Sequence, residues 1–426
     1  MILILSIVFI IFLLLGSPIM AAMGLSTWAS MITNELPSSL VALTGFDGLN
    51  SFTLLSIPLF LLAGEIMDKG GISSRLMNFV IRLVGSLPGG LGIAVVFASM
   101  LFSGLSGSVN ADAAAIGSLM IPSMEKAGYR KEYASAIVAA AAGTGILIPP
   151  SITMIILGTI ANLSIKELFL ASLLPAAVIG ISKALIIWYR AKTGIEKTNE
   201  RILFSFKDLM ISFLHALPSL LAPIIILGGI ITGVFTATES AVIAVLYSTF
   251  LACVVYRELT WKHLQEIAIS IVRSTGIVVG LIATATGIAY LMAYSMVSVN
   301  LGNWIGGYVN NYFIFITILI ILFWILGAVM DGIPALVILI PVFMPLAVQA
   351  GMDPIHFAIF SLAVFGVSLV SPPLGTACFV VAGIAKIEIT ALFKPIYPFM
   401  IVMFATVLLL AYVPWFSLFI PSLFHK

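Results

Sequence analysis

Apolar stretches long enough to cross a lipid bilayer recur from one end of the chain to the other. Each holds about 17 to 25 apolar residues, and at about 1.5 Å of rise per residue a helix of this length spans a hydrocarbon core of about 30 Å. The connections between them are short, and the longest polar one lies at residues 190–207. The pattern predicts an all-α membrane protein with many spans and no separate water-soluble domain.

Two of the apolar stretches are interrupted by a Gly residue followed by a Pro pair. They read Gly143-Thr-Gly-Ile-Leu-Ile-Pro-Pro150 and Gly366-Val-Ser-Leu-Val-Ser-Pro-Pro373, and they lie 223 positions apart. A Pro pair removes two amide donors and leaves upstream carbonyl groups without partners, which hydrocarbon cannot satisfy. Each break must therefore face protein, water or a bound ion, and paired breaks in corresponding halves are typical of a transport site.

The same offset aligns further Gly and Pro residues in the two halves without a gap over 47 residues. The pairs are Gly104 with Gly327, Pro122 with Pro345, Gly128 with Gly351, Gly143 with Gly366, and Pro150 with Pro373. The loop near Arg130 is basic, whereas no Lys or Arg lies within ten residues of Asp353. The two copies are therefore expected to enter the membrane from opposite faces, which predicts inverted repeats. Chance alignment of small residues in an apolar chain is the alternative.

Each half also contains a small polar interruption between two apolar arms. The arms lie at about residues 90–103 and 113–124 in the first half, and at about 313–326 and 335–346 in the second. Arms of about 14 residues extend only about 20 Å as helices, which is too short to span. They predict two re-entrant helical hairpins, with two ordinary spans joined by tight turns as the alternative.

Charge and composition agree with a membrane protein and give it an orientation. The chain is 62% hydrophobic and 8% charged, with a mean hydropathy of +1.23, which does not describe a water-soluble surface. By the positive-inside rule, the regions that hold most of the Lys and Arg are cytoplasmic. These regions are residues 69–82, 126–131, 190–207, 257–273 and 386–394. The connections expected to face outward hold one Lys and no Arg, at residues 34–50, 161–168, 232–238 and 299–312.

Exposed backbone at the hairpin tips and breaks suits an anion and a cation at once. Helix N-termini that follow Asn110 and Pro334 carry free N–H groups and partial positive charge, which favour an anionic group. Carbonyl groups released at the Gly-Pro-Pro breaks are hard oxygen ligands suited to a sodium ion. The sequence therefore predicts that substrate and coupling ion bind close to the breaks.

Carboxylates at membrane depth are costly and usually functional, which directs attention to a few acidic residues. Asp112 and Asp331 lie at the two inferred tips, one in each half, and a capping role for the returning helix is the alternative for both. Glu239 follows an outward turn and is expected to fix a helix start. Glu65 and Asp68 lie close to an interface, where solvated charges are expected.

Signatures of an enzyme are absent from the sequence. The four His residues lack metal-ligand spacing, the two Cys residues lie far apart in apolar segments, and there is no HExxH motif, nucleophile elbow or phosphate loop. The pattern favours a transporter over an enzyme. A pore is less easily excluded, but duplicated half-membrane hairpins around broken helices suit alternating access better.

One connection is itself amphipathic. Residues 71–84 place Arg75 and Arg82 seven positions apart beside apolar side chains, which predicts an arm lying at the cytoplasmic face. Residues 299–309, with Trp304 and Tyr308, are expected to form its outer counterpart.

Four stretches resemble the large membrane subunit, DctM/SiaM type, of the tripartite ATP-independent periplasmic (TRAP) transporters, within the ion transporter superfamily. They are residues 103–122, 145–151, 233–241 and 371–375. The resemblance covers nearly the whole chain. Mild departures occur at Ala237, Ser371 and Leu374, where the family often has Pro, Thr and Val.

The resemblance implies an elevator-type fold, in which a scaffold holds a mobile transport domain made of two re-entrant hairpins and two broken transmembrane helices. The implied ranges are scaffold helices and cytoplasmic arm at 1–87, hairpin 1 with its broken helix at 88–165, scaffold helices with the loop 190–210 and the outer arm at 166–310, hairpin 2 with its broken helix at 311–388, and a C-terminal helix at 389–426.

The resemblance also implies sodium-coupled secondary active uptake of an organic acid anion, of the sialic acid or C4-dicarboxylate type, across the bacterial inner membrane. The implied partners are a small four-helix membrane subunit, a periplasmic substrate-binding protein and the lipid bilayer, with no nucleic acid. A stand-alone sodium-coupled carboxylate transporter of the same superfamily is the alternative.

Two or more sodium ions are implied, together with the residues that would hold them. A first sodium site would use Ser103, Ser106, Gly145, Ile148 and Pro150, and a second would use Gly327, Gly366, Leu369 and Pro372. The substrate would meet Ser108, Asn110, Asp112, Asp331, Pro334 and Thr376. Because the first half is richer in side-chain oxygen, its ion site is expected to be the better defined, while the second relies on backbone carbonyl groups.

Overall fold

Helices make up all the regular structure of the described chain. The computed structural model describes residues 1–106, 108–196, 203–297, 300, 312–330 and 332–424, with the side chains of residues 104–106 outside the description. Within these ranges eight helices are long and apolar enough to cross a membrane, or nine if a bent pair at 39–69 forms one span. The predicted all-α polytopic membrane protein is confirmed at this level.

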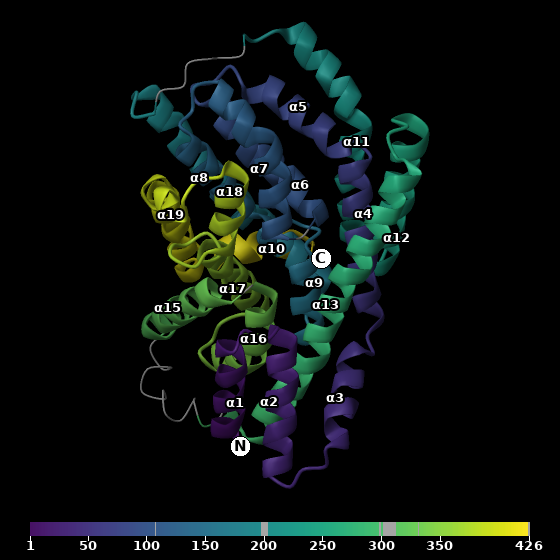
Figure 1. The fold of residues 1–426 in the computed structure, drawn as a ribbon, viewed down its shortest axis with the longest axis vertical. Helices are drawn as coiled ribbons and strands as arrows, with labels where there is room; N and C mark the ends of the chain where they lie inside the picture. The colour runs from purple at the N-terminus through teal and green to yellow at the C-terminus, as the bar shows by residue number, and fades with distance from the viewer. Residues whose placement is uncertain (107, 197–202, 298–299, 301–311, 331, 425–426) are drawn as a thin grey trace.

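One group of helices is formed mainly by the N-terminal and central parts of the chain (Figure 1). In it α4 packs on α12, α5 on α11, and α2 and α3 on α13, while α1 packs on α2. Its helices are α1 (Ile2–Leu14), α2 (Ile19–Thr33), α3 (Ser39–Leu49), η1 (Phe52–Leu55), α4 (Ser56–Lys69), α5 (Ile72–Val84), α11 (Phe206–Thr232), α12 (Ala237–Phe250), η3 (Leu251–Val255) and α13 (Trp261–Tyr294).

The other group contains both Gly-Pro-Pro breaks. Its centre is formed by α8 and α17, in which every residue from Tyr133 to Ala142 and from Ile355 to Ser368 is buried. Its helices are α6 (Gly90–Ser106), α7 (Val109–Lys126), α8 (Lys131–Ala142), η2 (Gly145–Leu147), α9 (Ile152–Ile160), α10 (Ile165–Lys192), α15 (Tyr312–Val329), α16 (Gly332–Gln349), α17 (Pro354–Ser368), α18 (Thr376–Ala385), α19 (Ile389–Tyr412) and α20 (Trp415–Phe424).

Helix bounds in the two halves of this second group correspond at the offset seen in the sequence. An offset of 223 residues converts the bounds of α7, 109–126, into those of α16, 332–349, and the start of α8 at 131 into the start of α17 at 354. The ends of α6 and α15, at 106 and 329, correspond in the same way. The aligned Gly and Pro residues therefore lie at equivalent positions in two similar series of helices.

The arms around the polar interruptions are longer than predicted. The first pair ends at Ser106 and restarts at Val109, where 103 and 113 were predicted, because the Ser108 hydroxyl accepts a hydrogen bond from the Ala111 amide at 3.3 Å and caps α7 within the polar stretch. Both α15 and α16 have 18 residues and reach about 27 Å. The prediction that the arms are too short to span is therefore wrong for this pair, and length does not separate a hairpin from two spans.

Helix α10 follows the boundary predicted at residue 165 and packs against helices on both sides of it in the sequence. Although the range 166–310 was assigned to scaffold helices, α10 packs against α6, α17, α19 and α20. Residues on several sides of α10 are buried, among them Ser172, Gly180 and Lys183. Because apolar helices look alike in sequence whichever helices surround them, composition could not reveal this neighbourhood.

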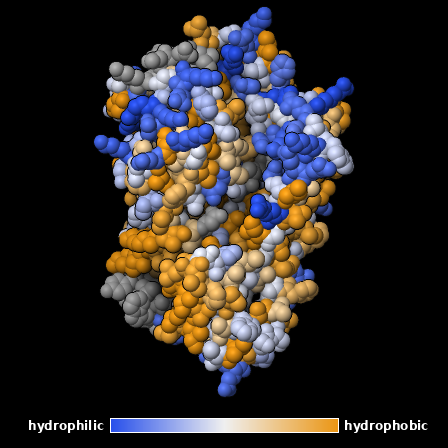
Figure 2. Space-filling view, in the orientation of Figure 1, coloured by the Kyte–Doolittle hydropathy of each residue, from blue (hydrophilic) through white to orange (hydrophobic). Residues whose placement is uncertain are grey.

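Hydrophilic residues gather at the upper end of the molecule, around α5 and the start of α11, while hydrophobic residues dominate the middle and lower parts (Figures 1 and 2). The predicted amphipathic arm is confirmed as α5, which starts after Gly71 in a left-handed conformation with φ +73°. Arg75 of α5 forms an ion pair with Glu258, with a nitrogen–oxygen distance of 2.7 Å. The predicted outer counterpart at 299–309 lies almost entirely outside the described residues.

The structural role predicted for Glu239 is confirmed. Its carboxylate accepts hydrogen bonds from the amide and hydroxyl of Thr236, at 2.8 and 2.9 Å, and its own amide donates back to that hydroxyl. This reciprocal pair is a capping box that starts α12.

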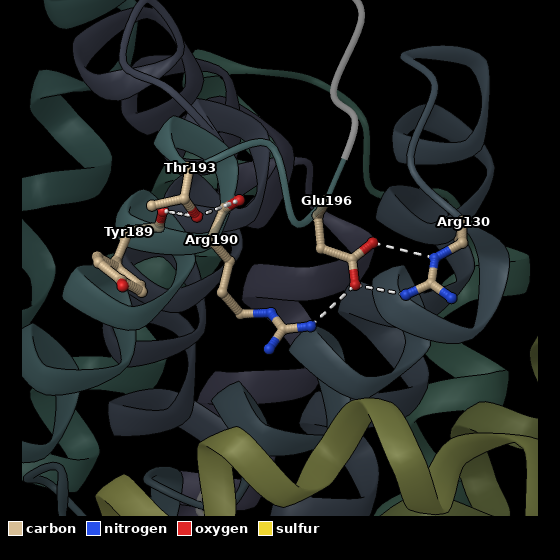
Figure 3. Close-up of polar contacts among 5 residues, drawn as sticks. All are labelled: Arg130, Tyr189, Arg190, Thr193 and Glu196. Carbon is tan, nitrogen blue, oxygen red and sulfur yellow. Dashed lines mark hydrogen bonds and ion pairs between the residues drawn. The ribbon is translucent and has the colours of Figure 1, made fainter.

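Two arginines hold one carboxylate where the chain leaves α10 (Figure 3). Glu196 is 3% exposed and accepts hydrogen bonds from Arg130 Nε at 3.0 Å and Arg190 Nη2 at 3.1 Å, with a further short bond from Arg130 Nη2. Hydrogen bonding to Glu196 raises the pKa of Arg130 above its ordinary value. The cluster joins the segment after α10 to the start of α8, so the connection toward α11 is fixed up to this point.

Replacing Glu196 by Gln should destabilise the second helix group. The charge-assisted bonds become weaker, and because Arg130 is 61% exposed we expect a loss of about 1–2 kcal/mol, below the usual upper range for bonds to charged groups. Thermal unfolding of the purified protein in detergent measures this as a lower midpoint. Glu388→Gln, at an exposed position, is the control. Equal midpoints for the two variants would contradict the assigned role.

Candidate functional site

The first break leaves backbone oxygens without amide partners. After α8 ends at Ala142 the chain makes a single 3-10 turn, η2, and then passes through Ile148 and the Pro149-Pro150 pair before α9. In the described part of the chain, the carbonyl oxygens of Ile148 and Pro150 accept no hydrogen bond from a backbone amide. Such carbonyl groups carry partial negative charge and face other parts of the protein.

A serine of α6 and a carboxylate of α7 meet this break. Ser103 and Asp112 are both fully buried, and the Ser103 hydroxyl donates a hydrogen bond to the Asp112 carboxylate. A Cβ atom placed on Gly145 would lie 2.5 Å from Ser103 Oγ and 2.7 Å from Asp112 Oδ2. Only glycine fits here, so the backbone of the break, the hydroxyl and the carboxylate lie in direct contact. Hard oxygens gathered in this way fit a sodium ion.

Predicted members of the first sodium site are thus brought together in part. Ser103 and Gly145 are adjacent, and Ile148 and Pro150 contribute carbonyl groups of the same break. The side chain of Ser106 lies outside the described residues. Asp112, predicted to contact substrate, lies with the sodium residues instead of lining the neighbouring cavity.

The second break has the same outline but a different chemistry. The residues that correspond to Ser103, Ser106 and Asp112 are Leu326, Val329 and Ala335. The Leu369 carbonyl already accepts the Ala377 amide at 3.1 Å, and the Ser371 carbonyl accepts the Gly375 amide at 2.8 Å.

Of the other residues predicted for the second sodium site, Gly327 packs against Ser368 and Phe365, and Gly366 lies within α17. Pro372 follows Ser371 within the break. The described part of the second site therefore offers backbone oxygen and no carboxylate.

The two breaks meet at a pair of glycines. A Cβ atom on Gly143 would lie 2.7 Å from the Gly366 carbonyl oxygen, and one on Gly366 would lie 2.5 Å from the Gly143 carbonyl oxygen. Gly332, at the start of α16, faces Leu369 and Ile146 at 3.4 and 3.6 Å by the same measure. The start of α16 therefore lies against both breaks, and the contact between the broken helices tolerates no side chain.

A cavity of about 280 Å³ separates the starts of α7 and α16, the predicted hairpin tips, from α4 and α13. On the hairpin side it is lined by Ser108, Ala111 and Ile333, and on the α4 side by Glu65 and Asp68. Ser270 of α13 donates a hydrogen bond of 2.6 Å to Glu65. Glu65 is partly buried in this wall, whereas Asp68 is exposed, as expected for a solvated charge.

Further cavities lead from this one toward the hydrophilic end of the molecule. A cavity of about 180 Å³ shares Asp68, Phe102 and Ala115 with it. A third, of about 580 Å³, shares Ser74 with the second and is lined by Arg75 and other polar residues of α5 and α11. The three cavities are neighbours in a series from the starts of α7 and α16 to α5, at the end predicted to be cytoplasmic.

Other predicted substrate residues lie close to helix starts. Asn110 is in the first turn of α7 and Thr376 begins α18, and these two helices pack together. The Asn110 Oδ1 and Thr376 Oγ1 atoms are buried with no hydrogen-bond partner among the described residues, which suits groups that receive a ligand. Pro334 is buried in the first turn of α16, and Asp331 lies outside the described residues.

One buried basic residue, Lys183, was not among the residues predicted from the sequence. Lys183 lies in the middle of α10 with no exposed surface, and its ammonium group contacts Thr144 at the first break. The signal was present, since an ionisable residue inside a long apolar helix is a functional candidate by default.

Broken helices, a buried oxygen cluster and a cavity between two helix groups define a multi-pass membrane transport protein. Residues 6–416 match the family described as tripartite ATP-independent periplasmic transporter, DctM component. The chain therefore belongs to the large permease family of TRAP transporters, and the resemblance seen in the sequence is confirmed. Its relatives are transporter permeases, in agreement with the expectation that it is not an enzyme.

Individual relatives are similar over most of this chain. The sialic acid TRAP transporter large permease SiaM of Vibrio cholerae is 34% identical, with 92% of each chain covered. The isethionate TRAP transporter permease DctMQ of Oleidesulfovibrio alaskensis is 34% identical over 96% of this chain, which spans 65% of the length of that relative. The crystal structure of the Alcanivorax borkumensis YdaH transporter shares the fold, with a TM-score of 0.59, 17% identity, and 87% and 86% of the two chains covered.

The glycine contact between the breaks gives a stability prediction. Gly366→Ala forces a methyl group against the Gly143 carbonyl oxygen, and we expect a loss of about 1–3 kcal/mol from overpacking. Gly383→Ala is the control, because a Cβ atom there meets nothing within 4 Å. The midpoint of thermal unfolding in detergent should fall for the first variant and stay within about 1 °C for the second. A midpoint for Gly366→Ala equal to wild type would contradict the close crossing of the breaks.

Proposed function

We propose that this chain is the large permease subunit of a TRAP transporter that couples sodium entry to uptake of an organic acid anion, of the sialic acid or C4-dicarboxylate type. The observation that carries the proposal is the contact of Ser103, Asp112 and Gly145 at the first break. It gathers a hydroxyl, a carboxylate and released carbonyl groups in a fully buried place. A buried anionic group needs a compensating cation or donors, and a sodium ion satisfies the charge and the oxygen ligands together.

Asp112 takes a different role in this proposal from the one that the family resemblance suggested. Its carboxylate is an oxygen ligand of the first sodium ion, or the acceptor that orients the Ser103 hydroxyl toward it. The second sodium ion is held by carbonyl groups around Gly327, Gly366, Leu369 and Pro372. Because those oxygens are uncharged, the second ion is the more weakly held of the two.

The substrate anion binds on the hairpin side of the 280 Å³ cavity. The start of α7 offers amide groups and partial positive charge, and close by, beyond the residues that line the cavity, the Thr376 hydroxyl can donate to the anion while Asn110 Oδ1 can accept from a substrate hydroxyl. Glu65 and Asp68 on the opposite wall repel an anion and so favour binding to the hairpin side. Sodium bound at the breaks adds positive charge next to the anion, which makes binding of the two cooperative.

Transport follows an elevator mechanism in this proposal, with the two helix groups as scaffold and mobile unit. The repeats of the mobile unit are inverted and the hairpins are re-entrant. We assign α10, α19 and α20 to the mobile unit, since they pack on α8, α17 and one another. The chain leaves this unit after Glu196, which the two arginines hold. The cavities that extend to α5 correspond to a state open to the cytoplasm.

The proposed partners are a small four-helix membrane subunit and a periplasmic binding protein that delivers the anion. The DctMQ relative supports the first partner, because that single chain is longer than this one and is named for two components. The location is the bacterial inner membrane. The second candidate is a stand-alone sodium-coupled carboxylate transporter of the same superfamily.

Uptake into proteoliposomes separates these functions. We expect radiolabelled N-acetylneuraminate or succinate to accumulate only when this chain, its small subunit and the matching binding protein are all present with an inward sodium gradient. Collapsing the gradient should remove accumulation. Uptake by this chain alone would favour the stand-alone transporter, and flux that ignores the sodium gradient would favour a pore.

Sodium binding at the first break can be measured without a substrate. Sodium chloride should raise the thermal unfolding midpoint of the purified wild type above that in potassium chloride, because a ligand that binds the folded state stabilises it. Ser103→Ala and Asp112→Asn should lose at least half of this shift and lower sodium-driven uptake, while both proteins still insert into the membrane.

The matched control is Ser118→Ala, since Ser118 is exposed on α7 and its hydroxyl bonds only to its own helix in the described structure. It should keep the full sodium shift. A wild-type shift retained by both Ser103→Ala and Asp112→Asn would contradict the assigned ion site.

A further inference from the structure

Lys183 is the one basic residue that the chain buries completely in the described part of its structure. It lies midway along α10 with 0% exposure. Its ammonium group donates to the Thr144 hydroxyl at 2.6 Å and, at shorter range, to the Ala140 carbonyl oxygen. Burial of such a group is costly unless its donors are satisfied, so a Lys at this position requires the two oxygens that it contacts.

Both oxygens belong to the place where α8 stops. In a continuing helix the Ala140 carbonyl would accept the Thr144 amide, but that amide bonds to the Ala141 carbonyl at 3.1 Å. The Ala140 carbonyl therefore has the Lys183 ammonium as its donor in place of the helical amide. The Thr144 hydroxyl accepts from Lys183 and donates to Ala141 at 2.8 Å, so it fixes the same turn from the other side.

The corresponding position in the second half of the chain holds no basic residue. The residue that corresponds to Lys183 at the offset of 223 is Thr406 in α19, whose hydroxyl bonds to Val402 of its own helix at 2.9 Å. The residue that corresponds to Thr144 is Val367, which still lies within α17 because that helix continues to Ser368. Because α17 continues past this position, its carbonyl group needs no donor from another helix. Because α8 stops earlier, Lys183 supplies the donor for the Ala140 carbonyl group.

We propose that Lys183 is a positioning residue for the first sodium site, which holds the end of α8 so that the carbonyl groups of the break, starting at Gly145, point toward Ser103 and Asp112. Thr144 precedes Gly145 directly, so a bond that fixes Thr144 fixes the first backbone ligand of the ion. The inference rests on the proposed sodium coupling. It adds a reason for unequal sodium binding in the two halves. Lys183 of α10 fixes the first break, whereas no basic residue of the described structure fixes the second.

Substitution of the two bonded residues tests this role. Lys183→Met keeps the length of the side chain and removes its donors, and Thr144→Val keeps the shape of Thr and removes its hydroxyl. Each should raise the half-saturating sodium concentration by at least fivefold, both for uptake and for the thermal shift of the purified protein. The half-saturating substrate concentration at saturating sodium should change less than twofold. The double variant should be no worse than the more affected single variant, because both remove one contact.

Two further variants complete the design. Thr144→Ser retains the hydroxyl and should restore the wild-type sodium response. Thr406→Val, at the corresponding position of the second half, should match wild type, because in the described structure its hydroxyl contacts Val402 of its own helix and Ser182 of α10, neither of which belongs to the first break.

The outcomes separate this inference from the proposed function. A wild-type protein with no sodium response would overturn the sodium coupling itself. If wild type responds to sodium and Lys183→Met does so with an unchanged half-saturating concentration, with only its amount or midpoint reduced, Lys183 is merely structural. A lower half-saturating concentration in Lys183→Met would show that the ammonium repels the ion, and would overturn the positioning role as well.

Discussion

Breaking a helix inside a membrane leaves backbone oxygens that only protein or a bound ion can satisfy, and the arrangement of this chain follows from that constraint. Both breaks follow buried helices, α8 and α17, of one helix group; Pro149 and Pro150 of the first are buried, whereas Pro373 and Leu374 of the second are exposed. They touch through Gly143 and Gly366, where no side chain fits. Helices α7, α16, α10 and α19 pack on α8 or α17 around this contact, so the site and the core of the group are one structure.

The two halves solve the same problem with different groups. At the first break side chains contribute, because Ser103 and Asp112 meet Gly145 and Lys183 holds the end of α8. At the second, apolar residues stand at the corresponding positions, and the chain satisfies its own carbonyl groups through Ala377 and Gly375. A shared outline with unequal chemistry is what a transporter needs if one ion is to be bound more firmly than another.

Much of the fold was predictable because Gly and Pro residues mark both helix breaks in the sequence. Gly and Pro positions located both breaks, and Ser103 and Gly145 lie together as the resemblance implied, whereas Asp112, expected at the substrate, lies with them. The neighbours of α10 were not predictable, since helices surrounded by lipid or by protein are similarly apolar. The arm lengths were misjudged because Ser108 caps a helix inside a polar stretch. The wall formed by Glu65 and Asp68 depends on how the two groups pack, which no local pattern encodes.

The central claim is that the first break holds a sodium ion, and locating that ion tests it most directly. High-resolution density should be compared for the purified protein in sodium buffer and in sodium-free buffer of equal ionic strength. We predict a density peak in sodium alone, enclosed by the Ser103 hydroxyl, the Asp112 carboxylate and carbonyl oxygens of the break. Identical density in both buffers, with the Ser103 hydroxyl still donating to Asp112 and no ion between the oxygens, would contradict the account.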